Sequence, residues 1–423
     1  MQTRHDVIQG DPLPTPPPHN RPAPWDYPPP QDRSNSISVN PLLTLSDGEL
    51  VGRLCPATTL EAWTFTAQEI REALQGERVL CPSIELSNAC NLNCPYCYVE
   101  HAKSLKKEKY TDQLTVAQIE DLVRRLADAG ARTINIIGAG EPTVDPAFER
   151  IVRLIASLGV KALVATNGIR VATSLKVLAA IVETRASVVL KCNSQDAKLQ
   201  DFLVGSKGYA AVRDKAFKAL LNAGLNKTRP TRLALNSLLM RANAGEILKL
   251  QEFCRRNNIA LIAGDYMPTG RTSGGQFRGE LVLEQQGGMC GAASEMFEPL
   301  DPTQRDCLAN EMASLDERLG YPLIPVVAYA SGIPCVQALG VCVDNRGWVW
   351  HCPARQQLIS PSVESKPLAI LSTRTIFTNL WSYDSYLQQV KRRFDGSCCY
   401  KPQINRHFKQ NTDDREKVYH GRT

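Results

Sequence analysis

The chain has 423 residues, 43% of them hydrophobic and 22% charged, so it can bury a large core and form one large domain with smaller appendages. Its net charge of +6 comes from Lys and Arg scattered among Asp and Glu, a pattern that gives no reason to expect a nucleic-acid partner. The sequence has no apolar run long enough for a membrane span and no secretory signal, so we expect a cytoplasmic protein without a membrane partner.

The N-terminal part of the chain divides into two segments. Residues 1–40 contain the proline-rich run PLPTPPPHNRPAPWDYPPP, which favours an extended tail because proline supplies no backbone donor to a helix or sheet. Residues 41–80 have a more mixed composition and include an amphipathic helix expected from Thr66 to Leu74. Nothing in the sequence indicates what this extension does.

From Cys81 onward, apolar and β-branched runs alternate with stretches of helical periodicity. Such alternation predicts parallel strands joined by right-handed crossovers and covered by helices, an α/β fold whose ligands lie at the C-terminal ends of the strands. The predicted strands are Ser83–Ser87, Arg132–Ile137, Val160–Thr166, Ser187–Asn193, Arg232–Met240 and Ile259–Asp265. We expect this domain to span residues 81–300 and a second cysteine-bearing unit to span residues 301–423.

Directly after the first predicted strand, the sequence CNLNCPYC places Cys90, Cys94 and Cys97 in a CxxxCxxC loop. Three thiolates in a short loop hold a [4Fe-4S] cluster with one iron left open for another ligand, since such a cluster usually takes four cysteines. The alternative is a structural zinc site, but zinc ribbons use paired CxxC knuckles and the sequence has no second knuckle of that spacing.

The loop resembles that of the radical S-adenosylmethionine (SAM) superfamily, over about Pro82 to Arg271. The resemblance implies a partial (β/α)6 TIM-like barrel in which the three cysteines bind the cluster, SAM chelates the open iron, and Tyr96 frames the adenine. It also implies an electron donor such as flavodoxin or ferredoxin, whose electron cleaves SAM to methionine and a 5′-deoxyadenosyl radical. That chemistry belongs to the cofactor, while the protein positions it.

Further candidate SAM-binding residues follow the later strands. The segment Gly138-Ala139-Gly140-Glu141-Pro142 is similar to the family's GGEP segment, and Thr166-Asn167-Gly168 is similar to its TNG turn, although either could be a purely structural turn. Asn193 and Ser194 end the fourth predicted strand and could contact ribose or carboxylate, or simply cap the strand. Asn236 and Arg241 near the end of the fifth strand are weaker candidates, because solvation alone explains an exposed arginine.

A second set of cysteines lies toward the C-terminus. Eleven residues lie between Cys335 and Gly347, and four lie between Gly347 and Cys352. The DNRG turn that ends at Gly347 predicts a hairpin between the two cysteines. This pattern resembles the auxiliary-cluster extension called twitch, the shorter relative of the SPASM domain, which implies one auxiliary [4Fe-4S] cluster held by Cys335, Cys352 and Cys398 or Cys399. The fourth ligand stays open between Cys342, both adjacent cysteines, or a substrate.

The resemblance implies hydrogen abstraction from a small sugar- or nucleoside-like natural-product intermediate, giving oxidation, dehydration, epimerisation or sulfur insertion. In an epimerisation a thiol would return the hydrogen, and Cys290, Cys307 or Cys342 could serve. One alternative is a peptide-modifying enzyme that matures a ribosomal peptide, which would normally need a leader-binding module. A remote alternative is a non-catalytic iron-sulfur electron-transfer protein, which would have no reason to keep an open three-cysteine loop.

Overall fold

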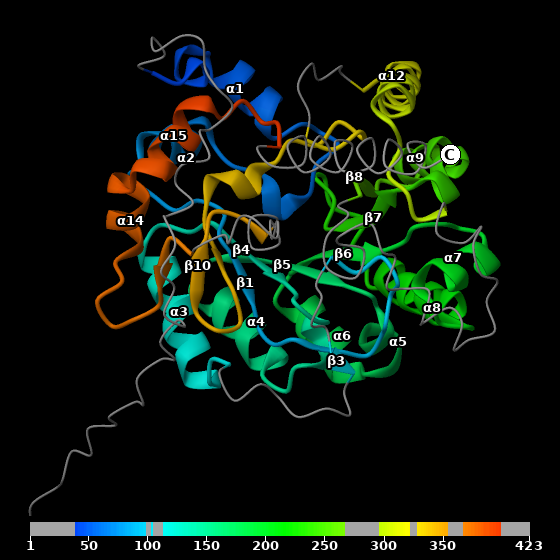
Figure 1. Cartoon of the computed structure of the whole chain (residues 1–423), viewed down its shortest axis with the longest axis horizontal. Coiled ribbons are helices and arrows are strands. Elements are labelled where there is room, and N and C mark those ends of the chain that lie inside the picture. The colour runs from blue at the N-terminus through cyan, green and yellow to red at the C-terminus, as the bar shows by residue number, and fades with distance from the viewer. Residues whose placement is uncertain are drawn as a thin grey trace, which may run out of the picture.

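The computed structural model describes residues 39–98, 103–104, 113–266, 296–321, 328–353 and 367–398 (Figure 1). Its centre is a sheet of nine strands in the order β11-β10-β9-β1-β4-β5-β6-β7-β8. The strands from β1 to β8 in this order are parallel, and each lies within two residues of a predicted strand at both ends. They are β1 (Ser83–Glu85), β4 (Thr133–Ile137), β5 (Lys161–Thr166), β6 (Ser187–Lys191), β7 (Leu233–Leu239) and β8 (Ala260–Asp265).

Helices cover one face of this sheet. Alternate strand residues such as Ile136, Val164 and Val188 pack against apolar helix residues in the largest core cluster, where each is fully buried. Burial on this face is what orients the amphipathic helices, because each of them has a single apolar stripe to bury. The helices are α3 (Val116–Asp128), α4 (Phe148–Ser157), α5 (Ile169–Thr173), α6 (Leu175–Glu183), α8 (Tyr209–Asn222) and α9 (Ile247–Arg256), while α7 (Ala197–Val204) packs on α8.

The N-terminal extension covers the other face of the sheet, toward the N-terminal ends of its strands. It comprises η2 (Pro41–Thr44), α1 (Asp47–Leu54), η3 (Glu61–Trp63) and α2 (Ala67–Gln75). Trp63 is buried with the inward strand residues Leu163 and Val189, and its indole N–H donates to Asn135 Oδ1 at 2.9 Å. The helix expected at Thr66–Leu74 is confirmed as α2, which begins with a capping box between Thr66 and Glu69. This extension therefore belongs to the barrel's own core.

The C-terminal unit continues the same sheet. Strand β9 (Cys342–Val343) pairs in parallel with β1, and it forms the expected hairpin with β10 (Trp348–Trp350), which pairs with β11 (Ala369–Ile370). Gly347 adopts φ of +83° in the turn, a conformation that suits glycine. The helices of this part are α12 (Pro302–Arg318), η7 (Val336–Leu339), α14 (Phe377–Tyr383) and α15 (Ser385–Arg393).

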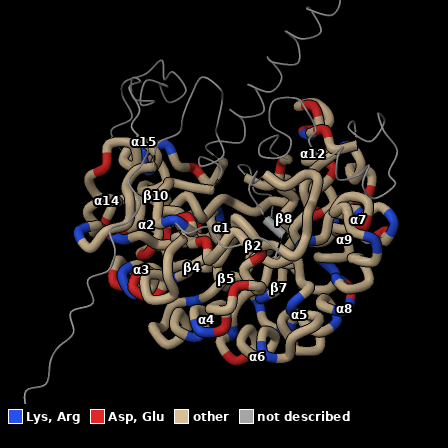
Figure 2. Tube along the Cα trace, turned by 60° about the horizontal axis from the view of Figure 1, so that its bottom comes forward, with Lys and Arg blue, Asp and Glu red and all other residues tan. Residues whose placement is uncertain are grey.

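Two contacts tie helices α14 and α12 to the rest of the molecule. Trp381 of α14 is fully buried, and its indole N–H donates to the Ala73 carbonyl of α2 at 2.9 Å. Helix α12 lies on α9, where Arg255 and Asp316 form a buried two-point ion pair at 2.8 and 2.9 Å. Figure 2 shows Lys and Arg positions interspersed with Asp and Glu positions along the described helices. None of the helices described is long and apolar enough to cross a membrane.

Candidate functional site

The three-cysteine loop leaves the sheet at the C-terminal end of β1. Cys90 ends the short strand β2 (Ala89–Cys90), which pairs with β3 (Lys103–Ser104), and Cys97 N–H closes a turn onto the Cys94 carbonyl at 3.1 Å. All three thiols are half-buried. Burial, together with the nearby negative charges of Glu141, Cys94 and Cys97, raises the pKa of Cys90 to about 12. The predicted ligands thus lie together beside the glycine-rich segment.

The Gly138–Pro142 segment packs directly on the base of this loop. The Glu141 N–H donates to the Ala89 carbonyl at 2.8 Å, and the Tyr98 hydroxyl donates to the Gly138 carbonyl at 3.1 Å. A Cβ on Gly140 would lie 2.1 Å from the Ala89 oxygen, so only glycine allows this approach. The glycines therefore serve contact between two backbone segments of the protein, as well as any contact with a ligand.

Glu141 points into the protein, where it joins two of the predicted binding segments. The buried carboxylate accepts hydrogen bonds from the Thr143 hydroxyl at 2.5 Å, the Thr166 hydroxyl at 2.6 Å and the Asn167 N–H at 2.7 Å. Burial raises the pKa of Glu141 even though these hydrogen bonds lower it. The side chain predicted to bind SAM is thus engaged in fixing the turns after β4 and β5, and a direct SAM contact from it stays a prediction.

The Thr166-Asn167-Gly168 turn reaches back to the cysteine loop. The Asn167 side-chain amide donates to Asn91 Oδ1 at 2.7 Å, between Cys90 and Cys94 in the sequence. Gly168 has φ of +83°, and a Cβ there would lie 2.5 Å from Leu190 Cδ1. Three segments predicted separately, the cysteine loop and the turns after β4 and β5, are therefore in contact.

The candidates after β6 and β7 are held mainly by the protein itself. Asn193 and Ser194 are almost fully buried: Asn193 Oδ1 accepts from Leu238 N–H at 3.1 Å, and the Ser194 hydroxyl donates to Glu246. Asn236 Oδ1 accepts from Lys191 Nζ at 2.9 Å, and Arg241 forms an ion pair with Glu298 at 2.8 Å. Their predicted contacts with SAM remain untested by this geometry.

The candidate hydrogen-returning thiols occupy different environments. Cys342 is fully buried in β9 against Ile137 and Trp350, and burial raises its pKa well above the ordinary thiol value. Cys307 is exposed on α12. Cys290 lies outside the described residues. A role for any of these thiols stays a prediction.

Three of the predicted auxiliary ligands gather around Tyr329. Cys335, Cys352 and Cys398 are half-buried, and besides burial their negative charges raise the pKa of the Tyr329 hydroxyl. The Cys335 N–H donates to the Gly396 carbonyl at 2.8 Å, and this hydrogen bond joins the two segments that carry Cys335 and Cys398. Cys399 lies outside the described residues. Cys352 follows strand β10 of the hairpin, and its charge acts on the same Tyr329 hydroxyl; that the three thiols share one cluster stays a prediction.

The donor chemistry of both cysteine sets fits iron-sulfur clusters. No three His, Cys, Asp or Glu side chains within the described ranges converge closely enough to hold a single metal ion. The thiolates around a cluster bind different irons and stand farther apart than the ligands of one ion, so half-buried thiols brought together by loops suit a cluster better. Cys90, Cys94 and Cys97 would hold the SAM-binding cluster, and Cys335, Cys352 and Cys398 the auxiliary one.

Sequence reasoning missed several residues that build the site. Tyr98, which bonds to Gly138, follows the cysteine motif directly, and its position beside Cys97 was the only available signal. Lys191 ends β6 with its ammonium 5.3 Å from the centre of the Tyr96 ring. The inward-facing Glu85 of β1 is buried, and its charge helps to raise the pKa of Tyr98, for which burial is the main cause. A charged residue at a strand end carries no motif, so only the fold reveals these neighbours.

Comparison with known proteins agrees with this geometry. The Radical SAM superfamily model matches residues 84–254. A probable GTP 3′,8-cyclase from Thermococcus kodakarensis is 30% identical over 181 residues, covering 42% of this chain and 54% of the relative. The mycofactocin maturase MftC from Mycolicibacterium smegmatis is 26% identical over 192 residues, covering 45% of this chain and 46% of the relative. The chain thus spans about half the length of the curated relatives that it matches.

Solved structures share the fold over a larger part of the chain. SuiB from Streptococcus suis, bound to the precursor peptide SuiA, has a TM-score of 0.52 at 15% identity and covers 78% of this chain and 71% of its own. The structure of anSMEcpe with bound AdoMet has a TM-score of 0.50 at 13% identity and covers 82% and 96%. The family match, the cysteine loop and the parallel sheet agree, so residues 84–254 form a radical SAM domain, a type of domain that uses a [4Fe-4S] cluster and SAM.

Proposed function

We propose that this protein is a radical SAM enzyme that modifies a peptide, with an auxiliary iron-sulfur cluster in its C-terminal unit. The supporting observation is that the fold likeness to peptide-bound SuiB extends over 78% of the chain, well beyond the radical SAM domain and into the unit that carries the second cysteine set. The relative MftC is also named as a maturase. These similarities favour the peptide over the sugar- or nucleoside-like substrate first expected.

The described residues would hold the cofactors and position the cysteine loop. Bound cluster and SAM together supply radical chemistry that removes a hydrogen atom from an unactivated carbon. The turns after β4 and β5 hold the cysteine loop in place, while Lys191 and Glu85 place opposite charges on the inner side of β6 and β1. Cys335, Cys352 and Cys398 would hold a second redox centre.

Peptide recognition would not use residues 39–80 as a separate leader-binding module. Their helices are buried against the face of the sheet opposite helices α3 to α9 and against α14, as Trp63 and Ala73 show. The peptide would instead be recognised at the C-terminal ends of the strands, where ligands of parallel α/β sheets bind.

The test is anaerobic turnover of the reconstituted 423-residue chain with SAM, dithionite and synthetic candidate precursor peptides, chosen from short reading frames near its gene. We expect 5′-deoxyadenosine together with a peptide lighter by two hydrogen atoms or cross-linked, and neither product from the Cys94→Ala variant. A parallel reaction with GTP tests the second candidate, which the 30% identity to a probable GTP 3′,8-cyclase supports. Product from GTP and none from any peptide would overturn the peptide proposal, and absence of 5′-deoxyadenosine from the cluster-loaded protein would overturn the radical proposal.

A further inference from the structure

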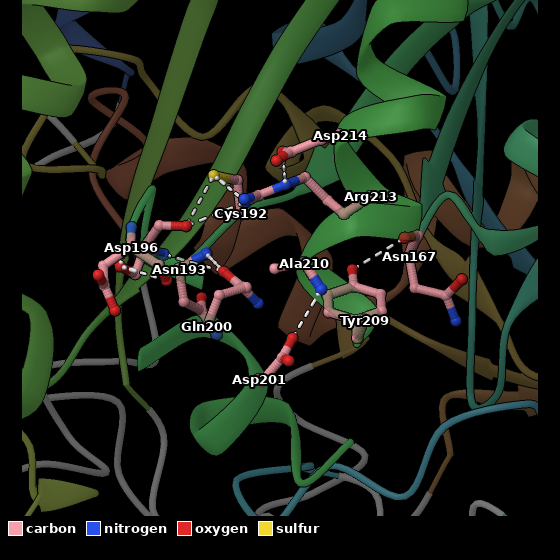
Figure 3. A network of polar contacts seen from close by, with 11 residues as sticks. Asn167, Cys192, Asn193, Asp196, Gln200, Asp201, Tyr209, Ala210, Arg213 and Asp214 are labelled. Carbon is pink, nitrogen blue, oxygen red and sulfur yellow. Dashed lines mark hydrogen bonds and ion pairs between the residues drawn. The ribbon is translucent and has the colours of Figure 1, made fainter. Parts of the chain in front are cut away.

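The first turn of α8 faces two strand-end turns at the same time (Figure 3). Tyr209 and Arg213 are four residues apart on this helix, so they share one face, and each is only 3% exposed. The Tyr209 hydroxyl donates to the Asn167 carbonyl after β5 at 2.8 Å. Arg213 donates to the Ser194 carbonyl after β6 at 3.0 Å and lies 2.8 Å from Cys192 Sγ. A single helix face therefore joins the two turns.

The position of α8 is itself fixed by α7. The Asp201 carboxylate accepts the N–H of Ala210 at 2.7 Å and also that of Gly208, at the start of α8. Gln200, which is fully buried, accepts the N–H groups of Asn193 and Ser194 at 2.8 and 3.0 Å. Helix α7 thus anchors both the beginning of α8 and the turn that Arg213 reaches.

Tyr209 also connects this arrangement to the cysteine loop. Its ring belongs to the buried cluster that contains Tyr96 and Phe297, against which Leu92 and Cys94 of the cysteine loop pack. The Asn167 whose carbonyl it holds also bonds Asn91 in that loop. The hydroxyl fixes the turn at one point and the ring supports the cysteine loop at another.

We propose that Tyr209 and Arg213 are positioning residues that keep the turns after β5 and β6 at a fixed spacing beside the cysteine loop, and thereby set the affinity for SAM. The proposal rests on SAM binding at this loop and is independent of the substrate. Neither residue is placed in contact with the reacting atoms. Their effect is expected in cofactor binding, because loss of one buried hydrogen bond shifts a turn without removing a ligand of the cluster.

The decisive variant is Tyr209→Phe, which removes one hydroxyl and keeps the ring. We expect the SAM dissociation constant, measured by anaerobic equilibrium dialysis on the reconstituted full chain, to rise about three- to tenfold. Iron content should stay at the wild-type level, and uncoupled formation of 5′-deoxyadenosine at saturating SAM should keep its rate, so that KM for SAM changes and kcat does not.

Tyr321→Phe is the matched control, because the Tyr321 hydroxyl also donates to a backbone carbonyl, that of Arg255 at 3.3 Å, away from this site. A purely structural role would lower the thermal stability of both variants and leave SAM affinity unchanged in both. Arg213→Lys keeps a cation and should bind SAM more tightly than Arg213→Met, which keeps none.

Wild-type SAM affinity in Tyr209→Phe, or an equal loss of affinity in Tyr321→Phe, would overturn the inference. The same assay separates this failure from failure of the proposed function. If the cluster-loaded wild type binds and cleaves SAM while Tyr209→Phe is indistinguishable from it, the inference alone is wrong. If the wild type neither binds nor cleaves SAM, the proposed enzyme activity is wrong.

Discussion

The close approach of Gly140 to the cysteine loop leads to a sharp prediction for Gly140→Ala. The new Cβ would lie 2.1 Å from the Ala89 oxygen and 2.6 Å from the carbonyl carbons of Asn88 and Ala89, where ordinary contacts begin at 3.4 Å. All three neighbours are backbone atoms, so no rotamer change can relieve the overlap, and one segment must move by roughly 1 Å. Because Cys90 follows Ala89 directly, this movement displaces the first cluster ligand.

We expect Gly140→Ala to lose stability by about 1–3 kcal/mol or more, and to lose iron content and SAM affinity together. Thermal unfolding, iron per chain after anaerobic reconstitution and equilibrium dialysis with SAM measure the three effects. Gly52→Ala is the control, because Gly52 lies inside α1 with no atom within 4 Å of a new Cβ, and it should gain about 0.5–1 kcal/mol. Wild-type iron content and SAM affinity in Gly140→Ala would refute the reasoning.

Three other changes test separate parts of the structure. In Glu141→Gln the amide NH2 group must face either the Asn167 N–H or the threonine donors, so one pair of hydrogen-bond donors opposes another. We therefore expect the free energy of unfolding in urea to fall by about 2–3 kcal/mol, and an unchanged midpoint would contradict this geometry. Cys335→Ser should remove about half of the bound iron while SAM affinity stays at the wild-type level, whereas full iron content would rule out this ligand. Burial lowers the pKa of Lys391 from 10.5 to about 8, so between these pH values the unfolded chain holds a proton that the folded chain has lost. The free energy of unfolding should therefore rise with pH across this window by at most about 3 kcal/mol, and Lys391→Met should lack that rise. If the two proteins gave parallel curves of unfolding free energy against pH, Lys391 would not be the source of the pH dependence.

Local sequence was sufficient to find the strands and the cysteine loop. Runs such as Val160–Thr166 alternate with amphipathic helices, and a period of this kind is set by which face each element must bury. The spacing of Cys90, Cys94 and Cys97 is a property of one short loop, so it could be read without knowing the fold. The hairpin around Gly347 was predictable for the same reason.

Other features depended on residues far apart in the sequence, and only the tertiary structure decided them. Resemblance to a family segment made Glu141 a candidate for binding SAM, and that contact stays a prediction. Only the fold shows that its carboxylate accepts hydrogen bonds from Thr143, Thr166 and Asn167, as a buried carboxylate requires. The sequence of residues 41–80 indicated no role for this extension, and only the structure shows Trp63 buried against the face of the sheet opposite the helices.

The sequence by itself determined the order of the strands and helices and the short motifs at the strand ends, because periodicity and spacing are local properties. The tertiary structure decided which motifs touch. It brought Asn167 to Asn91, placed β9 beside β1, and gathered Cys335, Cys352 and Cys398 around Tyr329. These contacts join residues many positions apart, and their formation depends on burial of the whole sheet, which no single segment of the chain encodes.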